Sequence, residues 1–285
     1  MPCYLVSYMD KYEKVEQIVN RMIDNGVIPM SDEDYSICRF ISDNLDNIPL
    51  IKFKDNILDV NQMWKKSINS FTIYEDKLLL ERIINILKRI RINVDNTSSN
   101  ISSFKSNIDT SNKDINNCFI PHSITVPGRF NDLAPLYFRH EMHHILKDTN
   151  PSEYKYMLLY ADVIPMFFEL VQSGLYDDTS KKAIINTRLA LISDLKRFID
   201  IHDSRDEKNY ITNIIDSKRC QYLNSFYYSI MLYKLYKSNP HGVLNIVKKV
   251  LMGEITTDTL IDIFGLCDRS HDNDVIDEIN KIKRK

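Results

Sequence analysis

Two histidines four residues apart, with a glutamate directly after the first, are the side chains of this sequence best suited to chemistry. They stand in the run His140-Glu141-Met142-His143-His144. On a helix, residues four apart lie on one face, so His140 and His144 can direct their imidazoles at a single point. A catalytic zinc ion takes three protein ligands, commonly histidine nitrogens, and keeps a position for water. Glu141 lies about 100° around the helix from His140, which is where a general base for that water belongs.

The residues around this motif favour a buried, capped helix. Asn131-Asp132 form a capping pair, with Asp132 as the expected N-cap, and Pro135 falls in the first turn, where its missing N–H does no harm. Residues 148–151 end the helix. Its apolar residues are Leu133, Leu136, Tyr137, Phe138, Met142, Ile145 and Leu146. Because unpaired histidine and glutamate are costly to bury, this setting predicts a metal site.

A third ligand is expected from the next helix, which offers two carboxylates. Asp162 and Glu169 are seven residues apart, which is two turns, so they share a face. With a tight turn near residue 150 and about 1.5 Å of rise per residue, the height of Asp162 matches that of the two histidines better than the height of Glu169. Glu169 takes the ligand role if the connection is looser. The neighbours of both are apolar, so either carboxylate needs a cation or a metal.

The elements that must position these side chains are mostly helical. Apolar spacing predicts helices over 59–68 and 74–92 within an N-terminal helical region, residues 1–93. Residues 94–117 are mostly Ser, Asn, Thr, Asp and Lys, which is typical of a flexible loop. Residues 118–285 then form the domain that carries the motif, beginning with a strand at 118–126. We expect that strand to be an edge strand beside the motif helix, available to a substrate backbone.

Composition limits the function classes. The 285 residues include only six glycines, which suits a mainly α fold, and the net charge of −2 gives no basic field to attract nucleic acid. Five scattered cysteines without a C-x-x-C pair favour a reducing compartment. We find neither a signal peptide nor an apolar run long enough to span a membrane. The expected location is therefore cytoplasmic, with no membrane or nucleic-acid partner.

Two segments together resemble a known family of zinc peptidases. Phe138-Arg139-His140-Glu141-Met142-His143-His144 and the later run from Ala161 to Glu169 are similar to the thimet oligopeptidase and oligoendopeptidase F family. The resemblance implies a shortened, zincin-like helical catalytic domain of the gluzincin type. It also implies that Asp162 is the third zinc ligand and that Glu169 supports it. The family's tyrosine cluster, which helps to stabilise the tetrahedral intermediate, corresponds to Tyr222, Tyr227 and Tyr228.

The chain departs from that family at several points. The family usually has glycine where His143 stands and glutamate where Asp162 stands, and its large N-terminal region is mostly missing here. A second similarity is the R-x-x-Y pattern of Arg219 and Tyr222. Clostridial neurotoxin light chains use such a pair to stabilise the oxyanion, so Arg219 is a further candidate.

The sequence therefore predicts a zinc-dependent metallopeptidase that hydrolyses oligopeptides or a specific protein. One zinc ion per chain is expected, with His140, His144 and Asp162 or Glu169 as ligands and Glu141 as the general base. A tyrosine or Arg219 would stabilise the oxyanion. Two alternatives remain: a catalytically inactive helical binding or regulatory protein that retains a metal site, and a toxin-like zinc protease.

Overall fold

The computed structural model describes residues 32–45, 54–69, 71, 76–115, 117–151, 153, 160–173, 182–183, 185 and 210–284. This part of the chain is mainly helical, as the sequence predicts, and contains two small sheets where only one strand was expected. Among the helices described, none combines the length and the apolar composition needed to cross a bilayer.

A three-stranded sheet lies beside the motif helix. It contains β2 (Arg91–Asp95), β3 (Lys105–Lys113) and β4 (Phe119–Pro127) in the order β2-β4-β3. β4 runs parallel to β2 and antiparallel to β3. The buried, β-branched Ile124 and Val126 suit the centre of a sheet. The strand predicted at 118–126 is thus present, but its expected edge position is wrong: β4 is central, and β2 and β3 are the edge strands within the described residues.

The segment expected to be a flexible loop, residues 94–117, is largely ordered into pairing elements. It holds the end of β2, a short 3-10 helix at Ile101–Ser103, and the whole of β3. The polar composition misled the prediction because β3 is a mostly exposed edge strand, so pairing with β4 and not burial of apolar side chains sets its conformation. Whether residues 94–117 divide the chain into domains stays a prediction.

Three helices precede or flank the sheet: α2 (Asp32–Asn44), α3 (Val60–Asn69) and α4 (Lys77–Leu87). α3 matches the predicted helix at 59–68 within a residue. α4 is shorter than the predicted 74–92. It starts after Asp76, whose side chain accepts a hydrogen bond from Leu79 N at 2.8 Å. It ends early because the chain enters β2 at Arg91 and pairs there with β4.

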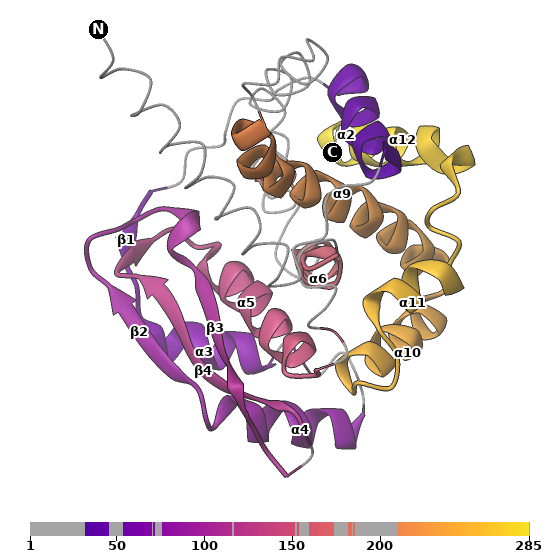
Figure 1. The fold of residues 1–285 in the computed structure, drawn as a ribbon. Coiled ribbons are helices and arrows are strands. Elements are labelled where there is room, and N and C mark those ends of the chain that lie inside the picture. The colour runs from indigo at the N-terminus through magenta and orange to yellow at the C-terminus, as the bar shows by residue number, and fades with distance from the viewer. Residues whose placement is uncertain are drawn as a thin grey trace, which may run out of the picture.

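The motif helix α5 (Ala134–Asp148) is central to the molecule (Figure 1). It packs against α3, β3 and β4, and also against α6 (Val163–Ser173) and α10 (Pro240–Leu251). The second sheet pairs β1 (Asn56–Ile57) with β5 (Arg129–Phe130). The remaining C-terminal elements are α9 (Tyr210–Ser238), α11 (Thr257–Ile263), a 3-10 turn at Arg269–His271 and α12 (Asp272–Arg284), which follows that turn directly. Phe138, Met142, Ile145 and Leu146 are fully buried, so α5 is fixed by the core on most of its surface.

Candidate metal centre

The start of α5 differs from the predicted cap. The N-cap residue is Leu133, which makes no side-chain capping bond, so the assignment of Asp132 as N-cap is wrong. Asn131 supplies the polar contact instead: its Oδ1 accepts a hydrogen bond from Leu133 N at 2.9 Å. Pro135 lies in the first turn, as expected. The helix then continues to Asp148, which places His140 and His144 one turn apart on one face.

Three side chains converge beside α5 and could hold a metal ion: His140, His144 and Asp162. Asp162 Oδ1 lies 2.9 Å from His140 Nε2 and 3.1 Å from His144 Nε2, and the two Nε2 atoms are 3.0 Å apart. The three donor atoms therefore form a nearly equilateral triangle. His144 and Asp162 keep 13% and 14% of their side-chain surface exposed, so solvent and a small ligand can reach the triangle.

The two acidic candidates occupy different sides of His140. Asp162 stands in the turn before α6, and its carbonyl accepts the first helical hydrogen bond, from Met166 N at 2.8 Å. Glu169 follows two turns later, is almost fully buried, and places Oε1 2.9 Å from His140 Nδ1. Asp162 thus faces the nitrogen that points at the triangle, whereas Glu169 faces the nitrogen on the back of the same ring.

The electrostatics of the triangle favour positive charge. Burial alone would raise the pKa of Asp162, but hydrogen bonds from His140 and His144 hold it well below its usual range. Burial opposes a charged imidazole, yet the carboxylates of Asp148 and Asp162 raise the pKa of His144 to about 10. The pKa of His140 is also raised, because Glu169 and Asp162 outweigh its burial. A site that retains protons so firmly has an excess of carboxylate charge, which a metal cation can neutralise.

Glu141 is fixed by the edge strand. Its Oε2 accepts a hydrogen bond from the backbone N–H of Ser106 in β3 at 2.7 Å. Because the Ser106 N–H points at α5, the side of β3 that is not paired with β4 faces the motif helix at this residue. Glu141 is only partly buried, so part of its side chain is open to solvent.

Among the predicted oxyanion residues, the structure describes the side chains of the three tyrosines. The Tyr227 hydroxyl donates a 2.5 Å hydrogen bond to Asp272, and burial together with that carboxylate holds the pKa of Tyr227 well above its usual range. Tyr228 is buried against Tyr160, and Tyr222 is partly buried. The side chain of Arg219 lies outside the described residues. The oxyanion role of these four residues stays a prediction, and the Asp272 contact lends Tyr227 no support.

His143, the residue that departs from the family pattern, belongs to the core. Its ring stacks on Phe168 with centroids 4.2 Å apart and lies 5.1 Å from the Phe71 ring. Its Nδ1 bonds the Arg139 carbonyl at 2.8 Å. Burial lowers the pKa of His143 to about 3, so the ring is neutral and packs as an aromatic residue.

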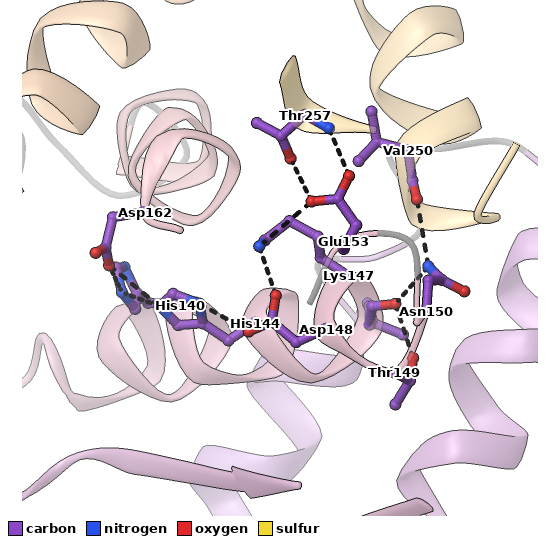
Figure 2. A network of polar contacts seen from close by, with 11 residues as sticks. His140, His144, Lys147, Asp148, Thr149, Asn150, Glu153, Asp162, Val250 and Thr257 are labelled. Atoms are coloured by element: carbon purple, nitrogen blue, oxygen red, sulfur yellow. Dashed lines mark hydrogen bonds and ion pairs between the residues drawn. The ribbon is translucent and has the colours of Figure 1, made fainter. Parts of the chain in front are cut away.

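Sequence reasoning missed several polar residues near the triangle. Asp148 lies one turn beyond His144, with Oδ2 3.6 Å from His144 Nδ1, and its spacing of four residues was a signal that could have identified it. Lys147 is buried beside Asp148 (Figure 2). Ser106 carried no signal, because its contact with Glu141 uses the backbone and depends on where β3 lies.

Comparisons with protein-family models, with curated proteins and with solved structures returned no match. The function is therefore inferred from the residues of this site and their geometry.

Proposed function

We propose that this protein is a zinc-dependent metallopeptidase that cleaves extended oligopeptides or an extended segment of a protein. The observation that carries the proposal is the triangle of His140, His144 and Asp162 with Glu141 on the next face of the same helix. Two histidines, a carboxylate and an open fourth position are the donor set of catalytic zinc sites. A glutamate beside the ligands supplies the proton transfer that peptide hydrolysis needs.

The spacing of the donor atoms fits zinc. Two ligands at about 2.0–2.1 Å from a tetrahedral zinc ion lie roughly 3.3 Å from each other. The three observed distances, 2.9, 3.0 and 3.1 Å, need to open by only a few tenths of an ångström. Asp162 and Glu169 divide the acidic roles: Asp162 completes the ligand set, and Glu169 orients His140 through Nδ1.

A zinc ion bound by these residues would polarise the scissile carbonyl and lower the pKa of a water molecule. The protein's own part in the reaction falls to Glu141. Its Oε2 is held by Ser106 N–H, so we assign the proton transfer to Oε1, which takes a proton from water and delivers it to the amide nitrogen that leaves as the amine. Solvent exposure of His144 and Asp162 gives the water access.

The edge strand offers a place for the substrate backbone. β3 has β4 on one side, and within the described residues no strand pairs with its other side. Ser106 directs its N–H from that side toward Glu141. An extended peptide that pairs with β3 by main-chain hydrogen bonds would pass next to Glu141 and the metal triangle. This arrangement favours substrates bound by their backbone over substrates recognised by a deep pocket.

The substitution Glu141→Gln tests the proposal, because it keeps the shape of the side chain and leaves the metal ligands unchanged. We expect the variant to retain zinc, as measured by elemental analysis, and to lose hydrolysis of a fluorescence-quenched peptide library by at least about 10²–10⁴-fold. Equal turnover by Glu141→Gln and the parent would refute the assigned mechanism. A parent that binds zinc but cleaves no peptide would instead identify a metal-binding protein without peptidase activity.

A further inference from the structure

A buried polar network extends from His144 to the start of α11. It consists of His144, Asp148, Lys147, Glu153 and Thr257 (Figure 2). Asp148 Oδ2 lies 3.6 Å from His144 Nδ1, and Asp148 Oδ1 lies 2.5 Å from Lys147 Nζ. Lys147 Nζ is also 3.6 Å from Glu153 Oε2. Glu153 accepts hydrogen bonds from Thr257 N at 2.5 Å and from the Thr257 hydroxyl at 2.9 Å.

This network is costly to bury. Lys147, Glu153 and Thr257 are fully buried and Asp148 is nearly so. Removing each charge from water costs several kcal/mol, and a buried ion pair often stabilises a fold no better than apolar residues of the same size. An ionic network inside the protein therefore calls for a role other than stability alone. Its position at the end of α5, directly behind a metal donor, indicates what that role is.

Each of the two histidines has a carboxylate behind it. His140 directs Nε2 at the triangle and meets Glu169 with Nδ1, and His144 directs Nε2 at the triangle and meets Asp148 with Nδ1. An imidazole that binds a metal through Nε2 carries its proton on Nδ1, and a carboxylate at that proton fixes both the tautomer and the ring orientation. Asp148 is therefore placed to act on His144 as Glu169 is placed to act on His140.

Asp148 has the capacity for two partners. Its contact with Lys147 is an ion pair whose angles are not those of a hydrogen bond. A carboxylate has about four lone-pair sites, so Asp148 can hold the Lys147 ammonium through Oδ1 and still receive the His144 proton through Oδ2. The distance of 3.6 Å to His144 is that of an ion pair and exceeds a hydrogen bond. The attraction between Lys147 and Asp148 therefore sets the distance between the Asp148 carboxylate and the His144 ring.

Glu153 competes with Asp148 for the Lys147 ammonium. Glu153 also caps α11, because it accepts a hydrogen bond from Thr257 N, one of the first N–H groups of that helix. The side chain of Thr256 supplies the other cap contact of α11. We propose that Asp148 is the positioning residue for His144, that Lys147 holds the Asp148 carboxylate in place, and that Glu153 connects Lys147 to the N-terminus of α11. This inference rests on the proposed metal site, and it makes α11 part of the support for the metal.

Metal affinity tests the role of Asp148. The variants Asp148→Ala and Asp148→Asn and the parent chain are titrated with Zn²⁺ against a chromophoric chelator, well below their unfolding temperatures. We expect Asp148→Ala to lower the zinc affinity by about 10–100-fold, and Asp148→Asn, which can still accept the His144 proton, to lower it less. The absorption bands of the Co²⁺-loaded Asp148→Ala protein should also shift, because the orientation of His144 changes.

Glu278 on α12 provides the matched control. It is a buried carboxylate paired with a lysine, Lys237, away from the metal triangle. Glu278→Ala and Glu278→Gln should lower the unfolding temperature but leave the zinc affinity and the Co²⁺ spectrum unchanged. An equal loss of affinity in the Asp148 and Glu278 variants would reduce the role of Asp148 to fold stability and overturn the inference.

The far end of the network gives a second test that does not alter α5. Glu153→Gln leaves Lys147 paired with Asp148 alone, so Asp148 is drawn from His144 and the zinc affinity should fall several-fold. Unchanged affinity and an unchanged Co²⁺ spectrum in Glu153→Gln would contradict the network even if the Asp148 variants failed to fold.

The results also separate this inference from the proposed function. A parent chain that binds neither Zn²⁺ nor Co²⁺ overturns both. A parent that binds both ions, beside Asp148 and Glu153 variants that bind them equally well, overturns only the positioning role. Loss of affinity in those variants supports the positioning role whether or not the parent cleaves peptides.

Discussion

At the scale of single residues, the two nitrogens of each histidine have different partners. Nε2 of His140 and of His144 meet each other and Asp162, whereas the Nδ1 atoms meet Glu169 and Asp148 respectively. The contacts at Nε2 are within hydrogen-bond distance, whereas those at Nδ1 are ion-pair contacts that place a carboxylate behind each ring. In the proposed metal site, the acidic residues around the triangle would therefore differ in function according to which nitrogen they face.

The difference between Asp162 and Glu169 gives a direct prediction. Asp162→Ala removes a donor atom of the triangle and should lower zinc affinity more than Glu169→Ala, which removes only the partner of His140 Nδ1. For Glu169→Ala we expect a loss of about 10–100-fold. Competition with a chromophoric chelator measures both. A Glu169 variant that loses zinc beside an Asp162 variant that keeps it would reverse the two roles.

His143 makes a separate prediction about acid stability. Its folded pKa is lowered from 6.5 to about 3, so between these values the unfolded chain binds more protons than the folded chain. The stability that comes from neutral His143 is complete above about pH 6.5 and is lost as the pH falls toward 3, by up to about 1.4 kcal/mol per pH unit.

In the metal-free protein, His143→Phe should retain the stacking on Phe168 and flatten this part of the pH dependence. Urea unfolding of both proteins between pH 4 and 7 measures the slopes. The loss of the bond to the Arg139 carbonyl can lower the stability of the variant at every pH, but it does not alter the slope. Identical slopes in the two proteins would show that His143 already titrates in the folded state.

At the scale of elements, the site depends on how α5 meets β3. α5 supplies the two histidines and Glu141, and β3 holds Glu141 through one backbone N–H. The strand that was expected to be a loop thus contributes to the site without any reactive side chain. Pro121 in β4 pairs with Ile108 next to a register shift at which His122 is the extra residue. A proline is compatible with a bulge, where ladder bonds are missing in any case.

Ser106→Pro tests the contact between β3 and Glu141. Proline has no N–H, and an edge strand tolerates it where the N–H points away from the neighbouring strand. The variant should keep zinc but lose part of the peptidase activity, because Glu141 is no longer held. Ser106→Ala keeps the N–H and serves as the control, with activity close to that of the parent. Steady-state hydrolysis of one peptide substrate measures both variants, and equal rates would mean that the contact plays no part in catalysis.

At the scale of the whole molecule, the metal triangle and the residues around it connect α5 with several other parts of the chain. Asp162 comes from the turn before α6, Ser106 of the sheet contacts Glu141, and Thr257 of α11 contacts Glu153, which pairs with Lys147 of α5. Asn150 adds another link at the end of α5, because its side chain donates to the Val250 carbonyl of α10. Binding of a metal to the folded chain should therefore stabilise the molecule as a whole.

The predicted size of that stabilisation follows from mass action. At a free zinc concentration of about 100 times Kd, a ligand that binds only the folded state adds about 2.7 kcal/mol. For a chain of this size each kcal/mol raises the unfolding temperature by about 2–4 °C, so zinc should raise it by roughly 5–10 °C. Differential scanning calorimetry with zinc and with a chelator measures the shift. His144→Ala should abolish it, and a shift that persists in this variant would indicate a different metal site.

The sequence alone determined the local features of this protein. The spacing of His140 and His144 placed both on one helical face, and the apolar pattern predicted α3, the strand β4 and the mainly helical class. These features depend on residues close together in the chain, where backbone periodicity decides which side chains are neighbours. The preference for Asp162 as the donor beside the histidines also agrees with the structure.

Only the tertiary structure decided which distant groups meet. The local sequence of the Ser/Asn-rich segment does not favour a strand. The segment becomes β3 because its backbone forms hydrogen bonds with β4. The contact of Glu141 with Ser106 spans 35 residues and that of Glu153 with Thr257 spans 104. Such contacts depend on how whole elements pack, so they cannot be predicted from the spacing of residues along the sequence.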